Sequence, residues 1–89
     1  MSGVAVKWAR KQLTAGPVEK SVLFVLAVEA DRSGVCSLSS RRIAQDAGTD
    51  RATAWRILAR LADRGLVKWT EGTGRKPNTY QLQIDGRPP

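Results

Sequence analysis

The sequence contains no histidine and only one cysteine, Cys36, among its 89 residues. These scarcities exclude an internal disulfide and leave no plausible set of ligands for zinc. Without histidine, the chain lacks the most common general base of enzymes and cannot form a thiol–imidazole pair. The acidic residues are scattered along the sequence rather than paired. We therefore expect a protein that is not an enzyme, with no bound metal, no cofactor and no small-molecule substrate.

Long apolar runs are also missing. No segment approaches the roughly 18 consecutive apolar residues that span a bilayer. The first eleven residues interleave charges with Val and Trp, unlike the apolar stretch of a secretory signal. We expect no membrane partner and a cytoplasmic location.

Acidic residues are few, since eight Asp and Glu stand against fifteen Lys and Arg, for a net charge of +7. A chain of this length has room for one domain and one core. Such an excess of cations favours a polyanionic partner, because binding to phosphates releases condensed counterions. On charge alone, a merely soluble basic protein or one drawn to anionic lipid stays open.

The hydrophobic pattern divides the chain into a leader, a domain and a tail. Residues 1–16 are predicted to form a leader helix with Val4, Trp8 and Leu13 facing inward. Pro17 can start a second helix over residues 18–30, which is apolar around most of its circumference, so that a β-strand is the competing interpretation. The domain is predicted over residues 17–84, and residues 85–89 are predicted to be a flexible tail.

Two short helices with a tight turn between them follow. A serine at 39 or 40 can cap a helix that ends at Gly48, a residue that tolerates the left-handed conformation. Asp50 can cap a second helix over residues 51–64, in which Ala54, Ile57, Leu58 and Leu61 form an apolar stripe. This arrangement is typical of a helix-turn-helix, in which the second helix enters the major groove of DNA.

The rest of the chain alternates with a period of two residues. Residues 66–71 and 79–84 are predicted to be the strands of a β-hairpin whose basic loop spans residues 72–78, and residues 35–38 are a short extended piece. The predicted fold class is mainly α with a small β-hairpin: a winged helix-turn-helix with a three-helix core, a leader helix and a wing. Trp8, Trp69 and Cys36 are expected in the core, whereas Trp55 has three open roles: packing on the hairpin or leader, contact with DNA sugar, or contact in a dimer.

The segments DRSGVCSLSSRRIAQDAG and DRATAWRILARLADRGLVKW, a Gly/Arg-rich wing and NTYQLQI occur in this order. Together they resemble the winged-helix domains of actinobacterial and phage helix-turn-helix proteins, including DNA-binding parts of plasmid and phage replication initiators. The resemblance covers residues 22–84, and the Trp8-containing leader fits it. Thr49 stands where the turn in this family usually has an apolar residue, and Ala54 stands where the family usually has Val. We therefore expect the two helices of the helix-turn-helix to pack more loosely than is typical. The resemblance implies DNA binding, and it leaves repression, replication and partition open.

Candidate contacts with DNA come from three places. The side of the second helix opposite its stripe carries Arg56, which can pair with the O6 and N7 atoms of guanine, although a phosphate contact or a solvated side chain stays open. The N-terminus of the preceding helix offers free N–H groups to a phosphate, and the basic loop can reach the backbone. The predicted DNA-binding residues are Ser39, Ser40, Arg41, Arg51, Ala52, Thr53, Arg56, Arg60, Thr73, Arg75 and Lys76. Whether Lys7, Arg10 and Lys11 extend this basic surface stays open.

We therefore expect sequence-specific binding of double-stranded DNA by a small transcriptional regulator of phage or plasmid type, associated with the nucleoid. One alternative is the DNA-binding module of a replication initiation or partition factor. Another, from a different class, is a winged helix that binds an acidic protein partner. Assembly into a homodimer stays open, because no dimerisation helix stands out.

Overall fold

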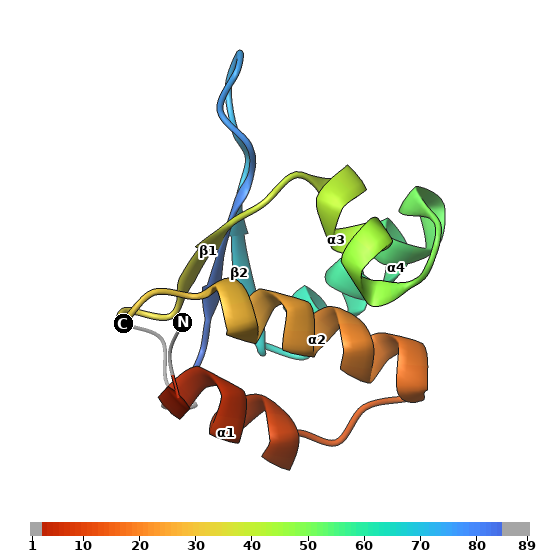
Figure 1. The fold of residues 1–89 in the computed structure, drawn as a ribbon, viewed down its shortest axis with the longest axis vertical. Helices are drawn as coiled ribbons and strands as arrows, with labels where there is room; N and C mark the ends of the chain where they lie inside the picture. Colours follow the sequence, from red (N-terminus) through yellow and green to blue (C-terminus); the bar gives the residue numbers. More distant parts are fainter. Residues whose placement is uncertain (1–2, 85–89) are drawn as a thin grey trace.

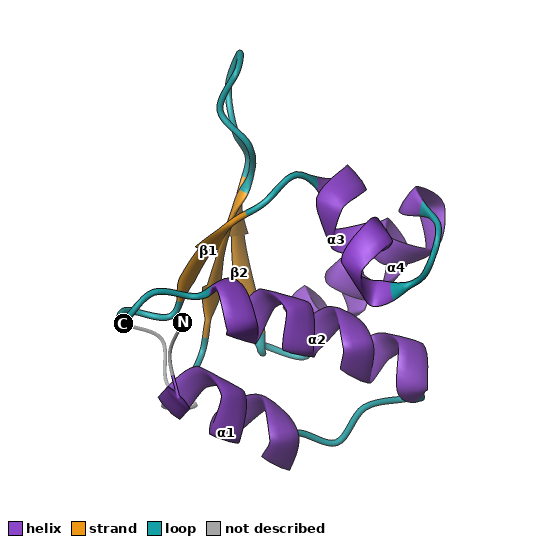
Figure 2. Ribbon diagram, viewed as in Figure 1, coloured by secondary structure: helices purple, strands orange, loops and turns teal. Residues whose placement is uncertain are grey.

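The computed structural model describes residues 3–84, and the predicted tail at 85–89 lies outside them. Residues 3–84 form four helices and a small sheet. Figures 1 and 2 show the helices to one side of the sheet and a long loop projecting from it. The predicted winged helix-turn-helix is confirmed, and the apolar segment after Pro17 is a helix rather than a strand. The elements are α1 (Gly3–Lys11), α2 (Pro17–Glu29), β1 (Val35–Ser37), α3 (Ser40–Ala47), α4 (Arg51–Asp63), β2 (Val67–Thr70) and β3 (Thr79–Leu82).

α2 is the central helix of the core. It contacts α1, α3, α4 and two strands of the sheet, and Figure 1 shows it crossing the middle of the molecule. Pro17 occupies its first turn, where a missing N–H costs nothing. Its side chains Val22, Leu23, Leu26 and Ala27 are fully buried on one side of the helix. The sequence shows no amphipathic pattern because the other side is also apolar, with Phe24 and Val25 half-buried and Val28 exposed.

The predicted inward face of α1 is wrong. Val4 is 64% exposed and Leu13 is 83% exposed, whereas Ala5 and Ala9 are fully buried. α1 ends at Lys11, so Leu13 is not on the helix at all and does not continue its periodicity. Small alanine side chains allow α1 to lie close against α2, and Trp8 packs against the core while remaining half-buried.

The helix-turn-helix forms as its capping residues predict. The hydroxyl of Ser39 accepts a hydrogen bond from the N–H of Arg42 at the start of α3. Gly48 ends that helix in the left-handed region, at a φ of 75°, where a side chain would be strained. The carboxylate of Asp50 accepts a hydrogen bond from the N–H of Thr53 at the start of α4. The turn between the two helices is therefore set by local chemistry.

Among residues 3–84 the sheet has three strands, because the short extended piece predicted at residues 35–38 joins the predicted hairpin. β3 is the central strand and pairs with both β1 and β2 in antiparallel fashion. The hairpin of β2 and β3 is confirmed, but the pairing of β1 joins residues more than forty positions apart, with Val35 opposite Gln81. Tyr80, in the middle of the central strand, is fully buried and is the largest such side chain.

Three aromatic rings connect α4 with the sheet. The ring centroids of Trp55 and Trp69, on α4 and β2, are 4.8 Å apart. The ring centroids of Trp69 and Tyr80, on β2 and β3, are 6.4 Å apart. Trp55 therefore packs against the hairpin, one of the roles left open by the sequence. Aromatic pairs at these distances are stabilising beyond the area that they bury, so they hold the helix and the hairpin in a fixed relation.

Cys36 lies in the core as expected and is fully buried. Burial, with smaller contributions from Glu29 and Asp31, raises the pKa of its thiol to about 11. The thiol is therefore neutral near pH 7 and behaves as a small apolar side chain.

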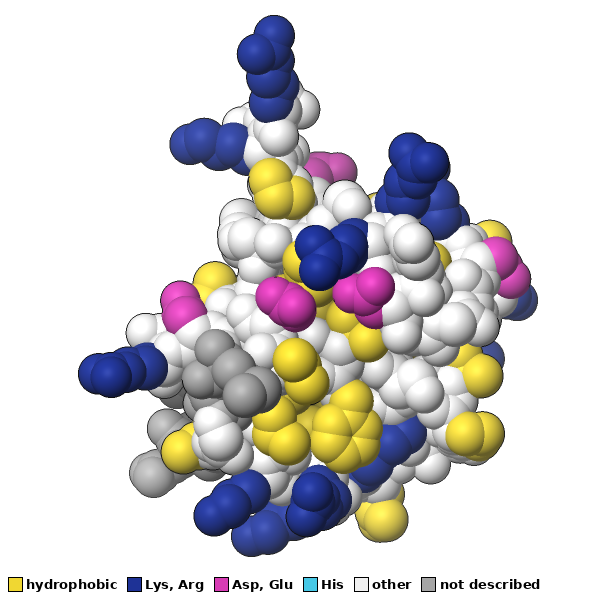
Figure 3. All heavy atoms as spheres, in the orientation of Figure 1, with side chains coloured by type: hydrophobic (Ala, Val, Ile, Leu, Met, Phe, Trp, Pro, Cys, Tyr) yellow, Lys and Arg dark blue, Asp and Glu magenta, His cyan; other side chains and the backbone are white. Residues whose placement is uncertain are grey.

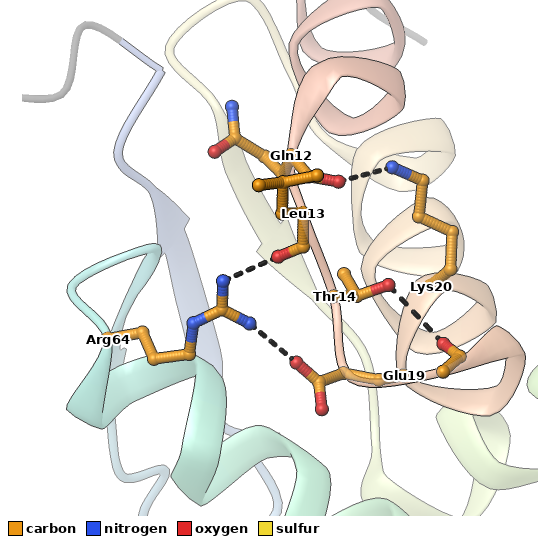
Figure 4. Close-up of polar contacts among 7 residues, drawn as sticks. Gln12, Leu13, Thr14, Glu19, Lys20 and Arg64 are labelled. Carbon is orange, nitrogen blue, oxygen red and sulfur yellow. Dashed lines mark hydrogen bonds and ion pairs between the residues drawn. The ribbon is translucent and has the colours of Figure 1, made fainter.

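A buried carboxylate joins three segments of the chain (Figure 4). Glu19 of α2 is 3% exposed, and its Oε1 accepts a hydrogen bond from Arg64 at 2.9 Å. Arg64, directly after α4, also donates to the backbone carbonyl of Leu13, and the ammonium of Lys20 donates to the carbonyl of Gln12. The same ammonium donates to the carbonyl of Arg10 at 2.8 Å. These two cations hold the end of α1 and the loop after it against α2 and α4.

We expect Arg64→Ala to lower the free energy of unfolding by about 3 kcal/mol, because it leaves the charge of Glu19 buried without its partner. Urea unfolding followed by circular dichroism measures the change. Arg64→Ala combined with Glu19→Gln should recover part of the loss, since no buried charge then remains. An equal loss in the double variant would show that the ion pair is not the cause.

Candidate nucleic-acid interface

One side of α4 is exposed and carries cations and small residues. Ala54, Ile57, Leu58 and Leu61 are buried. The opposite side exposes Ala52, Arg56 and Ala59, Arg60 is exposed beside them, and Arg51 is exposed in the first turn of the helix. Among residues 3–84, no salt bridge joins these arginines to a carboxylate. Their charges are therefore available to a partner outside the chain.

Arg56 is oriented by a short chain of hydrogen bonds at the start of α4. Its guanidinium donates to the hydroxyl oxygen of Thr53 at 3.2 Å, and that hydroxyl donates to Oδ2 of Asp50 at 3.0 Å. The other carboxylate oxygen of Asp50 accepts from the backbone N–H of Thr53 at 2.7 Å. One carboxylate thus caps the helix and positions the hydroxyl that holds Arg56.

Thr53 was predicted from the sequence only as a contact with DNA, and its role in holding Arg56 was not predicted. Its hydroxyl donates a hydrogen bond to Asp50 and accepts one from Arg56. The methyl group is the part of the side chain that is left for a contact with a partner. The spacing of Asp50, Thr53 and Arg56, each three residues apart, was the available signal, because such residues are neighbours on a helix.

The N-terminus of α3 presents a second set of predicted residues. The hydroxyl of Ser39 caps the helix, Ser40 is buried at 9% exposure, and Arg41 is exposed. A contact from Ser40 to a phosphate would therefore use its backbone N–H. Arg42 differs from Arg41, because it forms an ion pair with Asp46 at 3.2 Å.

The wing loop has a defined shape at its base. The side chain of Asn78 accepts a hydrogen bond from the N–H of Gly72 at 2.8 Å, closing the loop across its two strands. A Cβ atom on Gly72 would lie 2.1 Å from the carbonyl oxygen of Lys76, so only glycine fits there. The exposed residues beyond this closure are Thr73, Gly74, Arg75, Lys76 and Pro77.

Many of the exposed cations lie toward two ends of the molecule. Figure 3 shows Lys and Arg side chains at the tip of the wing and over the α3–α4 corner, a further group over α1 at the opposite end, and single cations between them. Lys7, Arg10 and Lys11 are all exposed on α1. In this orientation they do not join the group formed by the wing and the helix-turn-helix.

Other kinds of site find little support in the part of the chain that the structure describes. No group of three or more Cys, Asp or Glu side chains in residues 3–84 is arranged to hold a metal ion. None of the helices in this range has the length and apolar character needed to cross a membrane.

We expect Thr53→Val to raise the pKa of Asp50. Hydrogen bonds from the backbone and then the side chain of Thr53 hold the pKa of this carboxyl below its usual value, and the substitution removes the second while keeping the shape of the side chain. The stabilisation linked to this shift is present above the unfolded-state pKa and is lost as pH falls through the lower folded-state pKa. Titration of the Asp50 carboxyl by NMR measures the change, with Thr49→Val as the control. An unchanged pKa would contradict the proposed hydrogen-bond chain.

Comparison with known proteins agrees with this geometry. The model of the IclR helix-turn-helix domain matches residues 19–71, more than half of the chain, from the first turn of α2 to the residue after β2. Searches of curated proteins and of solved structures give no match. The DNA-binding helix-turn-helix implied by the sequence resemblance is confirmed, because the chain belongs to the IclR helix-turn-helix domain family.

Proposed function

We propose that this protein is a transcriptional regulator that binds double-stranded DNA in a sequence-specific manner. The observation that carries the proposal is the exposed surface of α4, where Arg51 in the first turn and Arg56 and Arg60 have no carboxylate partner among residues 3–84. α4 enters the major groove, and the loop of residues 72–78 contacts the flanking backbone or minor groove. The regulator is of phage or plasmid type and acts in the bacterial cytoplasm.

Arg56 is the residue assigned to reading a base. A guanidinium can donate two parallel hydrogen bonds to guanine, and this pairing needs a defined orientation. The hydroxyl of Thr53 supplies that orientation before DNA binds. Ala52 and Ala59, on the same side of the helix, are exposed and small, which permits close approach to the base edges.

The remaining predicted residues are assigned to the phosphate backbone. Arg60 lies beside Arg56 on α4, Arg51 stands in the first turn of that helix, and Arg41 stands at the start of α3. Thr73, Arg75 and Lys76 occupy the wing, where the closure at Gly72 limits the conformations of the loop. Contacts with phosphates position a protein on the duplex without reading its sequence.

The affinity for DNA should fall steeply as salt concentration rises. About six phosphate contacts predict a slope of about −5 when the logarithm of the association constant is plotted against that of the salt concentration. Fluorescence anisotropy with a labelled duplex measures the slope, and removing Arg75 and Lys76 should make it shallower by about one per charge. A flat salt response would contradict DNA binding through these cations.

Arg56→Ala should weaken binding at the cognate site by about 1–3 kcal/mol and reduce discrimination against other sequences, because it removes a base contact. Selection of bound fragments from random DNA identifies the site, and anisotropy on matched and mismatched duplexes measures the effect. Arg32→Ala, an exposed cation in the turn before β1, is the control. An equal loss on all duplexes would assign Arg56 to a phosphate instead.

A further inference from the structure

The outward side of α1 carries three cations and lies away from the helix-turn-helix. Ala5 and Ala9, which are fully buried, define the side of α1 that packs on α2. At about 100° per residue, Lys7, Arg10 and Lys11 fall on the opposite side of this helix, and all three are exposed. Figure 1 shows α2 between α1 and the α3–α4 corner, so these cations point away from the proposed DNA-binding surface.

The cations of α1 have no acidic partner in the described chain. The first acidic residue of the sequence is Glu19, which is buried and bonded to Arg64. Among residues 3–84, no salt bridge joins a carboxylate to a cation of α1, and Figure 3 shows no carboxylate within the group of cations over this helix. This surface therefore has one sign of charge, which is available to a partner.

Stabilisation of the helix does not account for all three cations. Arg10 and Lys11 stand in the last turn of α1, where a cation interacts favourably with the helix dipole. The backbone carbonyls of Arg10 and Gln12, however, already accept hydrogen bonds from the ammonium of Lys20. Lys7 precedes the last turn, and the dipole effect falls off within that turn. A contact with a partner explains all three positions.

The backbone beneath these cations is fixed to the rest of the molecule. Lys20 of α2 holds the end of α1, and Arg64 donates to the carbonyl of Leu13 in the loop after it. The small side chain of Ala9 lets the helix lie close against α2. The cations thus keep their positions while their side chains stay free to follow a phosphate backbone, which is contacted without being read.

We propose that the outward side of α1 binds the phosphate backbone of a second DNA segment while α4 and the wing hold the first. This inference rests on the proposed function, which brings DNA to the protein. A phosphate backbone carries one sign of charge along its length, as the α1 surface does, whereas a protein surface normally carries both signs.

Three phosphate contacts give weak binding that falls with salt. They predict a slope of about −3 when the logarithm of the association constant is plotted against that of the salt concentration. A contact of this strength becomes effective once α4 and the wing are on DNA, because neighbouring segments of the same molecule are then present at a high effective concentration.

Capture of a labelled duplex by an immobilised duplex tests the second contact. Beads that carry one duplex should retain the free duplex when the wild-type protein is added. Lys7→Gln combined with Lys11→Gln should lower the retained amount at low salt by about tenfold or more, because two phosphate contacts are lost. Arg32→Gln combined with Lys68→Gln removes the same charge from side chains that are exposed elsewhere, and it should leave retention unchanged.

Three results of the capture experiment would overturn the proposal. They are no retention by the wild-type protein, equal retention by the wild-type protein and the α1 variant, and equal loss in the α1 variant and its control. Vesicles of phosphatidylglycerol, added in place of the free duplex, test the other polyanion. Retention of vesicles without retention of duplex would assign α1 to a lipid surface and overturn the DNA contact.

Affinity for one short duplex shows whether α1 contacts the same DNA as α4. The Lys7→Gln and Lys11→Gln variant should bind a single short duplex as tightly as the wild-type protein, measured by fluorescence anisotropy. Its circular dichroism spectrum should also be unchanged, since both side chains face solvent. A loss of affinity for the single duplex as large as the loss in capture would place α1 on the first duplex and overturn the proposal.

A variant without the cations of α4 and the wing separates this proposal from the proposed function. Its substitutions are Arg51→Ala, Arg56→Ala, Arg60→Ala, Arg75→Ala and Lys76→Ala. It should retain weak duplex binding with a salt slope of about −3, and adding the two α1 substitutions should weaken that binding by about tenfold or more. Residual binding that ignores the α1 substitutions would overturn the α1 contact. A wild-type protein that binds no more tightly than this variant would overturn the proposed function and leave the α1 contact in place.

Discussion

Burial of the α4 stripe is the constraint on which the rest of the structure depends. Ala54, Ile57, Leu58 and Leu61 can leave water only by packing against α2, α3 and β2, and this packing determines which side of α4 faces outward. Because the period of the helix is fixed, the outward side must then be the one that carries Arg56. The hydrophobic effect thus determines which side of α4 is exposed, and the positive charges exposed there favour a polyanionic partner.

The orientation of α4 relative to the wing depends on contacts beyond the stripe. Trp55 and Trp69 connect the helix to the hairpin near its start, and Arg64 connects the end of the helix to α2 and to the loop after α1. A duplex that contacts both α4 and the wing requires these two elements to keep a constant separation. The aromatic pair and the buried ion pair supply this rigidity from opposite ends of one helix.

Much of the fold was predictable because its signals are local. Ser39, Gly48 and Asp50 define helix ends through bonds to residues within four positions, and alternation defines the two strands of the hairpin. The extended piece at residues 35–38 was predicted, but its pairing with β3 was not, since the partners of β1 lie more than forty residues away and no local pattern encodes them. The inward side of α1 was predicted wrongly because periodicity weighs large side chains such as Val4, whereas close helix packing selected Ala5 and Ala9.

In the candidate site, too, the features set by local sequence were predictable and those set by distant residues were not. The exposed side of α4 follows from helical geometry, so the positions of its arginines could be read from the sequence, whereas their contacts with DNA stay a proposal. Glu19 was missed, because an isolated glutamate near a helix start normally interacts with the dipole and solvent. Its burial follows from the return of the chain at Arg64, forty-five residues later.

Preorganisation is the physical reason to distinguish Arg56 from its neighbours. A free arginine loses side-chain entropy when a base fixes its guanidinium, and that loss opposes binding. The bond from Thr53, itself held by Asp50, restricts Arg56 before any contact with DNA. Arg51 and Arg60 have no such bond in the described chain, so their side chains remain free to follow a phosphate. Rigidity favours reading one base edge, and freedom favours contact with a backbone that is the same for every sequence.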